Sequence, residues 1–398
     1  MEALSDRIKN LEESATLAMA QKTRELKAQG LDVISLSLGE PDFPTPKHIQ
    51  EAAKDAIDEG KYFGYPPVPG YLDLRQAIAD KLQRDNKLSY TPNQIVVSTG
   101  AKQSLYNVMM CLVNPGDEVV VFAPYWVSYA DIIKLAGGTP VFVTGTIENN
   151  FKATADQLSE AITPRTKAIL YSSPSNPTGG VFSEEELRDI ARVVAQHENL
   201  YVIADEIYEY INFAGDHVSM AALPDMYERT ITVNGFSKGY AMTGWRLGYI
   251  AAPEWLAKAC NKIQGQSTSG ANSIAQRAAI TALTGDMGPT HDMAKAYQRR
   301  RDLVLGLLNE IPGIKTYVPN GAFYIFPDVS AYFGKSDGEQ TIADADAFCM
   351  YVLNKAYVSL VNGEAFGAPN CVRLSYAASD EQLKEAMRRL KEVLEDLK

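Results

Sequence analysis

The hydrophobic pattern between residues 93 and 265 alternates between two periods. Short apolar runs rich in valine and isoleucine predict buried strands at Ile95–Ser98, Glu118–Phe122, Lys167–Tyr171, Tyr201–Ala204, Thr230–Val233 and Leu247–Ala251. Amphipathic stretches at Gln103–Leu112 and Ser183–His197 predict helices, and Ser183 with Glu186 matches a capping box. This alternation predicts a mostly parallel sheet covered on both faces, with ligands at the carboxyl ends of its strands.

The two ends of the chain show a different pattern. A long charged helical stretch, Ala294–Glu310, is followed by the short apolar segments "GAFYIF" and "CVRLSYAA" and by a last helix that begins at Ser379 with Gln382 as capping partner. Because 398 residues exceed what one core usually organises, we expect a second, smaller α+β domain. The predicted fold is α/β, with a large domain at residues 46–293 in α/β/α layers and a small domain from residues 1–45 and 294–398.

Composition excludes several classes of protein. Apolar residues make up 46% and charged residues 22% of the chain, which is typical of a globular enzyme and not of disordered or fibrous proteins. A net charge of −11 argues against non-specific binding of nucleic acid or anionic membranes, and no apolar run reaches the roughly 20 residues of a membrane helix. The four cysteines show no paired spacing, which predicts a reducing, cytoplasmic location. The four histidines show no ligand spacing, so we expect no metal site.

An acidic residue directly follows one of the predicted central strands. In "LYVIADEIYEY", Asp205 comes just after an apolar run, where a buried carboxylate is costly unless a cation meets it. Asp205 would then face a protonated ring nitrogen of a ligand, with the phenol of Tyr208 nearby. The alternative is an ordinary turn or cap aspartate.

The segment "FSKGYAMTGWRLGY" places Ser237, Lys238 and Arg246 among glycines and apolar residues. A poorly solvated lysine amine has a lowered pKa and can attack a carbonyl to form a Schiff base, whereas most lone lysines are surface residues. Ser237 and Arg246 suit a phosphate, and the turn Ser98–Ala101 leads into a helix whose free amides attract anions. These segments point to one ligand with an aldehyde, a basic ring nitrogen, a phenolic oxygen and a phosphate, which is pyridoxal phosphate.

A series of motifs in order makes the chain resemble a class I, fold-type I aminotransferase that depends on pyridoxal phosphate, of the bacterial aspartate aminotransferase branch. The motifs are "SLSLGEPDFPTP", "YPPVPGYLDLR", "STGAKQSLYN", "FAPYWVSY", "YSSPSNPTGG", "IADEIYEY", "NGFSKGYAMTGWRLGY" and "CVRLSYA". The resemblance covers nearly the whole chain. It implies a homodimer whose active sites are shared across the interface.

The resemblance also assigns a role to each matching residue. Lys238 would be the catalytic Schiff-base lysine and would move the substrate α-proton, while Asp205 would pair with the ring nitrogen. The other residues implied to bind the cofactor are Tyr208 and Asn176 at the ring oxygen, Trp126 on the ring face, Ser237, Arg246, Gly100, Ala101 and Lys102 at the phosphate, and Tyr65 at the phosphate of the neighbouring subunit.

Substrate binding follows from the same resemblance. Arg373 would grip the α-carboxylate that every amino acid carries, and Gly39 would offer its amide, with Trp126 and Asn176 beside the substrate. Other aspartate aminotransferases read the side-chain carboxylate with an arginine of the partner subunit, but "QGQSTSGANS" contains none. We expect Lys102 to bind the side-chain carboxylate of the substrate. The alternative is that Lys102 is merely a solvated lysine at a helix start, and the segment around Thr16 is then the next candidate for binding this carboxylate.

The predicted activity is transfer of the amino group from L-aspartate to 2-oxoglutarate, which gives oxaloacetate and L-glutamate in two half-reactions. Aromatic, alanine or prephenate aminotransferases and a β-lyase on the same scaffold stay open as alternatives. Two alternatives are not enzymes. A ligand-binding regulator would need a DNA-binding domain in addition to the aminotransferase-like motifs. A nucleotide-binding protein without catalysis would lack the visible absorbance of the bound cofactor.

Overall fold

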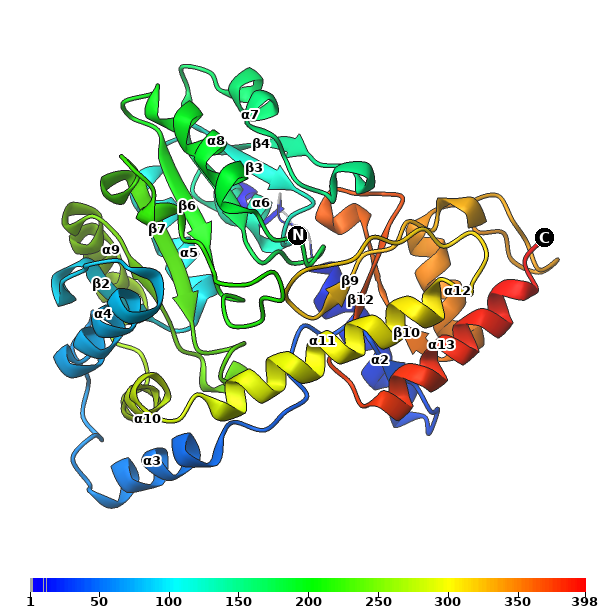
Figure 1. The fold of residues 1–398 in the computed structure, drawn as a ribbon, viewed down its shortest axis with the longest axis horizontal. Helices are drawn as coiled ribbons and strands as arrows, with labels where there is room; N and C mark the ends of the chain where they lie inside the picture. The colour runs from blue at the N-terminus through cyan, green and yellow to red at the C-terminus, as the bar shows by residue number, and fades with distance from the viewer. Residues whose placement is uncertain (1–2, 10, 12) are drawn as a thin grey trace.

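A seven-stranded sheet forms the centre of the larger part of the molecule, in a computed structural model that describes residues 3–9, 11 and 13–398 (Figure 1). Its strands, in spatial order, are β2 (Ile95–Ser98), β8 (Gly248–Ala251), β7 (Thr230–Gly235), β6 (Tyr201–Asp205), β5 (Thr166–Ser172), β3 (Glu118–Ala123) and β4 (Thr139–Thr144). Neighbouring strands pair in parallel except at β8, which is antiparallel to both β2 and β7. The predicted mostly parallel sheet is confirmed.

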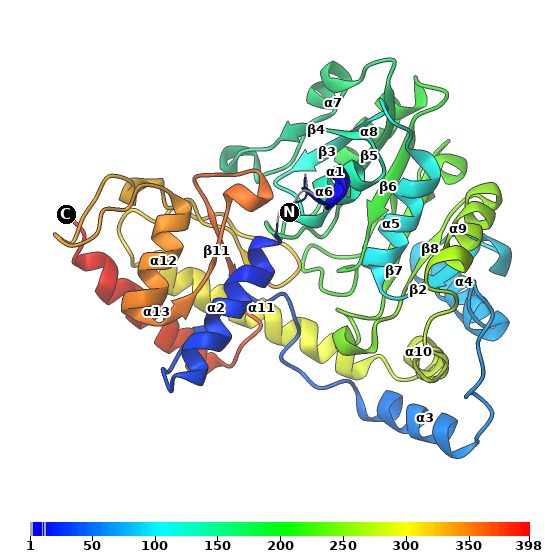
Figure 2. The ribbon, with the colours of Figure 1, turned by 180° about the vertical axis from the view of Figure 1, so that it is seen from behind.

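Helices cover both faces of this sheet. One face packs on α5 (Ala101–Leu112), α6 (Ser128–Leu135) and α9 (Glu254–Ser267). The opposite face packs on α7 (Ala155–Ala161) and α8 (Glu184–Ala195), and at its β2 end on α3 (Lys47–Asp58), α4 (Leu72–Asn86) and α10 (Ser273–Thr284). The layers are therefore α/β/α, and Figure 2 shows the face that carries α5 and α9.

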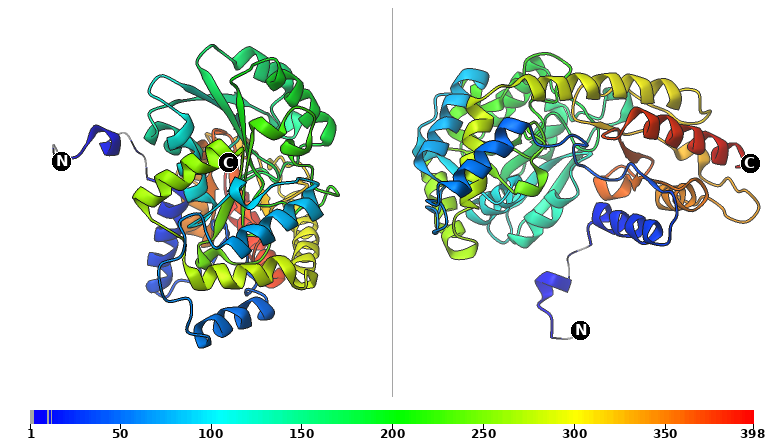
Figure 3. Two further views of the ribbon diagram at one scale, coloured as in Figure 1. Left: turned by 90° about the vertical axis from the view of Figure 1, so that its left-hand side faces the viewer. Right: turned by 90° about the horizontal axis from the view of Figure 1, so that it is seen from below.

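Both ends of the chain build the second, smaller part. Its helices are α2 (Ala15–Ala28), α11 (Gly288–Leu308), α12 (Ala345–Ala356) and α13 (Asp380–Glu395), and its strands are β1 (Ile34–Ser35), β9 (Tyr324–Ile325), β10 (Val358–Ser359), β11 (Val361–Asn362) and β12 (Val372–Ser375). β1 pairs with β10, and β12 lies between β11 and β9. A separate short helix, α1 (Asp6–Lys9), stands away from the body in both views of Figure 3.

The long helix α11 passes from the larger part into the smaller one (Figure 1). The predicted domain boundary at residues 293 and 294 falls inside it, and we keep this division as a proposal with α11 as the element that crosses it. In the described part of the chain, no helix combines the length and the apolar character needed to cross a membrane.

Local patterns gave the six predicted strands of the large sheet and the helices α5, α8 and α13 within two residues, whereas α11 begins six residues before its predicted start. Ser183 and Ser379 both cap their helices: each hydroxyl accepts from the amide of Glu186 or Gln382, whose side chain accepts from the serine amide in return. The strands not predicted are β4 and the short β1, β10 and β11; β4 lies at the edge of the sheet with several side chains exposed, and only Pro140–Val143 of it is apolar.

Candidate active site

The predicted site residues gather at one edge of the large sheet because of its strand directions. β3, β5, β6 and β7 end at this edge, so the segments that follow them bring Trp126, Asn176, Asp205 and Lys238 to the same side. β8 runs the opposite way, and its first residue, Gly248, pairs with both Gly235 and Ser98. Arg246, just before β8, therefore meets the turn after β2.

Lys238 and Asp205 are two ionisable groups held in poorly solvated surroundings. The Asp205 carboxylate is 4% exposed and accepts hydrogen bonds from the Tyr129 hydroxyl at 2.7 Å and the Ile207 amide at 3.2 Å. Burial raises the pKa of Asp205 to about 6, and burial lowers the pKa of Lys238 to about 8. Lys238 donates to the Gly39 carbonyl. Within the described residues, neither group forms an ion pair.

A turn and an arginine frame the place predicted for a phosphate. Gly100 has φ +80°, and a Cβ there would collide with the guanidinium of Arg246, so only glycine permits this approach. Gly100 caps α5, whose first amides, at Ala101 and Lys102, have no acceptor within the helix. Arg246 donates to the Thr243 carbonyl at 2.7 Å and pairs with no carboxylate of the described chain. The buried Ser237 follows β7 directly.

Arg373 lies in the middle strand of the small sheet and is 1% exposed. Its guanidinium donates to the Asn176 side chain at 3.0 Å and to the Ser37 carbonyl at 2.6 Å, while its Nε has no acceptor. Among the residues that the structure describes, no carboxylate neutralises this buried charge. An incoming anion such as a substrate carboxylate would do so.

Lys102 extends over the aromatic ring expected to stack on the cofactor. Its Nζ lies 4.7 Å from the centroid of the Trp126 ring. Partial desolvation, and then the charge of Arg246, lower the pKa of Lys102. Lys102 is nevertheless exposed, as the alternative of a solvated lysine at a helix start requires, and its contact with the Trp126 ring is what distinguishes it. The hydroxyl of Thr16, the other candidate, is buried with no partner among the described residues.

Tyr65 is the predicted site residue that does not join the others within one chain. Tyr65 is 98% exposed, and the nearby Phe63 is 70% exposed. A hollow opens beside Arg246 and is lined by Thr99, Trp245 and Phe43, among others. These exposed apolar residues and the hollow mark a surface that a second protein chain could cover.

Two tyrosines that the sequence did not suggest contact the predicted residues. Tyr129 donates to Asp205, and the hydroxyl of Tyr324 lies 2.8 Å from that of Tyr208. Tyr129 lies in α6, three positions after Trp126, which precedes that helix, and the two rings pack edge to face at 5.6 Å. Tyr324 is separated from Tyr208 by more than a hundred residues, and only the fold reveals their contact.

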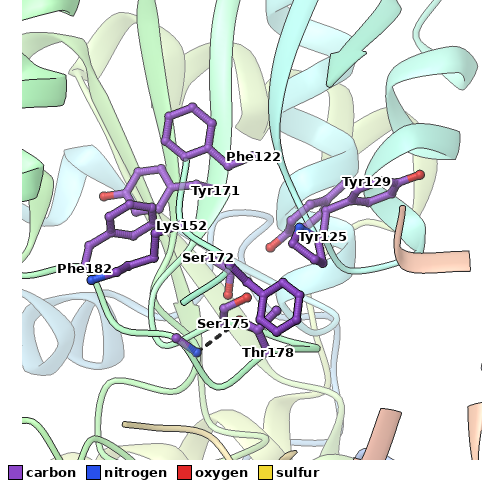
Figure 4. A pocket seen from close by; sticks show the side chains of 12 residues that line it. Phe122, Tyr125, Tyr129, Lys152, Tyr171, Ser172, Ser175, Thr178 and Phe182 are labelled. Atoms are coloured by element: carbon purple, nitrogen blue, oxygen red, sulfur yellow. Dashed lines mark hydrogen bonds between the residues drawn. The ribbon is translucent and has the colours of Figure 1, made fainter. Parts of the chain in front are cut away.

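A small pocket shares Tyr129 with this site but is otherwise distinct from it. It is lined largely by aromatic rings, with Phe122, Tyr171 and Phe182 on one side and Tyr125 and Tyr129 on the other (Figure 4). Lys238, Asp205 and Arg246 do not line it. The chemistry of the site therefore lies on the other side of this aromatic wall.

Folding also assembles a group of ionisable residues that the histidine spacing did not predict. Glu206, Glu209 and His217 bring one ligand atom each within 4.8 Å of one another, a possible metal-binding set. Glu206 pairs with His217 at 3.1 Å, and Glu209 accepts from the ammonium of Lys81. Because each carboxylate already has an internal counter-charge, this cluster is a buried ion-pair network.

Comparisons with known proteins agree with this geometry. The model of the family described as "Aminotransferase class I and II" matches residues 31–390. An aspartate/prephenate aminotransferase of Cereibacter sphaeroides is 48% identical, with 98% of each chain covered. An aspartate aminotransferase of Bacillus subtilis is 45% identical, with 98% of this chain and 99% of the relative covered. The crystal structure of the aspartate aminotransferase from Rhizobium meliloti superimposes with a TM-score of 0.95 at 41% identity, covering 99% of both chains.

Proposed function

The chain belongs to the aminotransferase class I and II family, and we propose that it transfers the amino group of L-aspartate to 2-oxoglutarate. One observation carries the choice of an acidic substrate. Two cations without carboxylate partners in the described chain, Arg373 and Lys102, lie beside the two residues proposed to hold the cofactor ring, Asn176 and Trp126. A dicarboxylate substrate would neutralise both.

The residues present fit pyridoxal phosphate. Asp205 is a buried carboxylate without a cation in the described chain, as a protonated ring nitrogen requires. Lys238 offers an amine with a pKa lowered to about 8, and Gly100 lets the Arg246 guanidinium approach the start of α5, where the two would hold a phosphate together. Pyridoxal phosphate supplies an aldehyde that exchanges amino groups and a ring that withdraws electrons from the substrate α-carbon.

The proposed catalytic step depends on the protonation state of Lys238. With its pKa lowered to about 8, a substantial fraction of the amine is neutral near pH 7 to 8, so Nζ can accept the substrate α-proton and return it at a neighbouring atom. Asp205, fixed by the hydrogen bond from Tyr129, would bind the ring nitrogen with its other carboxylate oxygen. Tyr208 and Asn176 would bind the ring oxygen, Trp126 would stack on the ring, and Ser237 and Arg246 would hold the phosphate.

The exposed surface around Tyr65 supports a homodimer with shared active sites. Phe63, Tyr65 and Leu72 are each more than 60% exposed, which is costly for a lone chain in water. We propose that Tyr65 contacts the phosphate in the partner subunit. Mixing Lys238→Ala with Tyr65→Ala subunits would then create one native site per hybrid dimer, and activity above the sum of the parents is expected; activity that never exceeds that sum contradicts the sharing. The four cysteines, none in a disulfide, support a cytoplasmic location.

A donor and acceptor screen tests the proposed substrates. Purified protein loaded with pyridoxal phosphate is offered aspartate, alanine or phenylalanine as donor and 2-oxoglutarate or prephenate as acceptor. We expect the highest kcat/KM for aspartate with 2-oxoglutarate. Prephenate is the second candidate acceptor, because a relative of 48% identity is named for both substrates. A preference for alanine or phenylalanine over aspartate would contradict the proposal.

A further inference from the structure

Tyr324 connects two groups that the proposed function treats separately. It lies on β9, beside β12 with Arg373, and its side chain is completely buried. Its hydroxyl is 2.8 Å from the Tyr208 hydroxyl, and its ring centroid is 4.7 Å from the Arg373 guanidinium carbon. One side chain therefore contacts both the residue proposed for the cofactor oxygen and the residue proposed for the substrate carboxylate.

The hydrogen bond between the two tyrosines has a defined direction once Tyr208 is engaged. Each phenol carries a single hydrogen. If Tyr208 donates its hydrogen to an anionic ring oxygen, the 2.8 Å contact can only be made by the hydrogen of Tyr324. A hydroxyl that accepts such a bond becomes a stronger donor, because neighbouring hydrogen bonds polarise one another. Tyr324 would then strengthen the bond that Tyr208 makes.

The ring of Tyr324 holds Arg373 in place from one side. Phe366 lies on the same guanidinium at 5.0 Å, so two aromatic rings restrain it. Gly39 packs against Tyr324 itself: a Cβ at this position would come within 2.5 Å of the Tyr324 hydroxyl. The rings leave Arg373 few orientations, and its Nη atoms are already directed toward Asn176 and Ser37.

We propose that Tyr324 is a positioning residue that couples the two halves of the site, with its hydroxyl acting through Tyr208 on the cofactor oxygen and its ring acting through Arg373 on the substrate carboxylate. This inference rests on the proposed function. The proposal has two parts, an effect of the hydroxyl and an effect of the ring, and a separate variant of Tyr324 tests each part.

Tyr324→Phe removes the hydroxyl and keeps the ring. The pH midpoint of the visible absorbance of bound pyridoxal phosphate is expected to rise by about 0.5 unit, because the anionic oxygen loses stabilisation. Binding of succinate, a dicarboxylate without an amino group, should stay within about twofold. The matched control is Tyr332→Phe, which removes another buried hydroxyl of the same core, bonded to the Pro312 carbonyl, and should leave the midpoint unchanged. An unchanged midpoint in Tyr324→Phe overturns the hydroxyl effect.

Tyr324→Leu removes the ring as well. Succinate binding, measured by calorimetry, is expected to weaken by a further three- to tenfold, about the size of a lost cation–π contact. If Tyr324→Leu does not fold, Phe366→Leu tests the opposite ring with the same expectation. Equal succinate affinity in the Phe and Leu variants, or an unchanged affinity in Phe366→Leu, overturns the ring effect. A wild-type protein that binds neither the cofactor nor succinate overturns the proposed function instead.

Discussion

Asp205, the last residue of β6, and Glu209 lie four positions apart, and both are buried, yet their surroundings differ. Glu209 accepts hydrogen bonds from the ammonium of Lys81 and from the amides of Asn86 and Asn234, at 3.1 and 3.0 Å. Among the described residues, Asp205 accepts only from the Tyr129 hydroxyl and the Ile207 amide. Glu209 is therefore neutralised by the protein, whereas Asp205 has no counter-charge from the described chain.

Lys81 and Lys238 repeat this difference. Lys81 forms a buried ion pair with Glu209, while Lys238 donates to the Gly39 carbonyl and forms no ion pair with a carboxylate of the described residues. A charge that the chain neutralises contributes to folding, and a charge left unpaired raises the free energy of the empty protein until a ligand binds. Unpaired buried charges therefore identify the active site, although both clusters contain the same residue types. Four predictions test this difference.

The largest effect is expected for Lys238→Ala. Loss of the group that moves the α-proton should lower transamination by at least about 10² to 10⁴-fold, because general acid–base catalysis alone contributes that much. The variant should still bind the cofactor without a covalent bond, and the free energy of unfolding of the empty protein should not fall. Turnover, absorbance and urea unfolding measure the three quantities, with the exposed Lys47→Ala as control. Near-normal turnover would remove Lys238 from the catalytic role.

Lys81→Met is expected to have the opposite profile. It leaves Glu209 buried without its cation, which typically costs about 3–5 kcal/mol of unfolding free energy. The double variant Lys81→Met, Glu209→Gln should recover part of this loss, because it also removes the unpaired charge. The control Lys47→Met, at an exposed lysine, should change the free energy of unfolding by less than about 1 kcal/mol. Urea unfolding of the empty protein measures all three. Full stability in the single variant would contradict the division between the two clusters.

The stability of the empty protein should depend on pH through Asp205. Burial raises its pKa from 3.8 to about 6, so the folded state binds a proton more tightly than the unfolded state. The folded protein should accordingly lose stability as the pH rises from about 4 to 6, by at most about 3 kcal/mol. Subtracting the curve of Asp205→Asn isolates this contribution from the other titrating groups. Parallel curves for the two proteins would show that Asp205 is already neutralised.

The smallest effect is expected for Lys102→Ser. Removing a charge-assisted contact of about 1.5–3 kcal/mol should lower kcat/KM for aspartate by about ten- to a hundredfold. Alanine and phenylalanine have no second carboxylate, so their efficiencies should stay flat or rise. The ratio of aspartate to alanine efficiency is the measured quantity, with Thr16→Val as the matched variant at the alternative position. A ratio that moves only in Thr16→Val would transfer the reading of acidic substrates to α2.

Short-range pattern determined much of this protein. The predicted fold class and family are confirmed. The sequence could predict the fold because central strands that are buried on both faces must be continuous apolar runs, and because helix caps involve residues only three positions apart. Some residues proposed for the site, Trp126, Asn176 and Lys238, lie in local motifs after the strands β3, β5 and β7, and Asp205 is the last residue of β6. Because these parallel strands end at the same edge, strand direction brings the four residues to one side.

Tertiary structure alone decided which buried charges are paired. The sequence singles out Asp205 and Lys238 as candidates but does not show that Lys81 and Glu209 neutralise each other. That pairing arises because α4 packs where Lys81 reaches Glu209. The contacts of Tyr324 with Tyr208 and Arg373 likewise join segments more than 40 residues apart. Such contacts depend on long-range packing of side chains, which hydrophobic periodicity does not encode, because periodicity specifies only the face on which a residue lies.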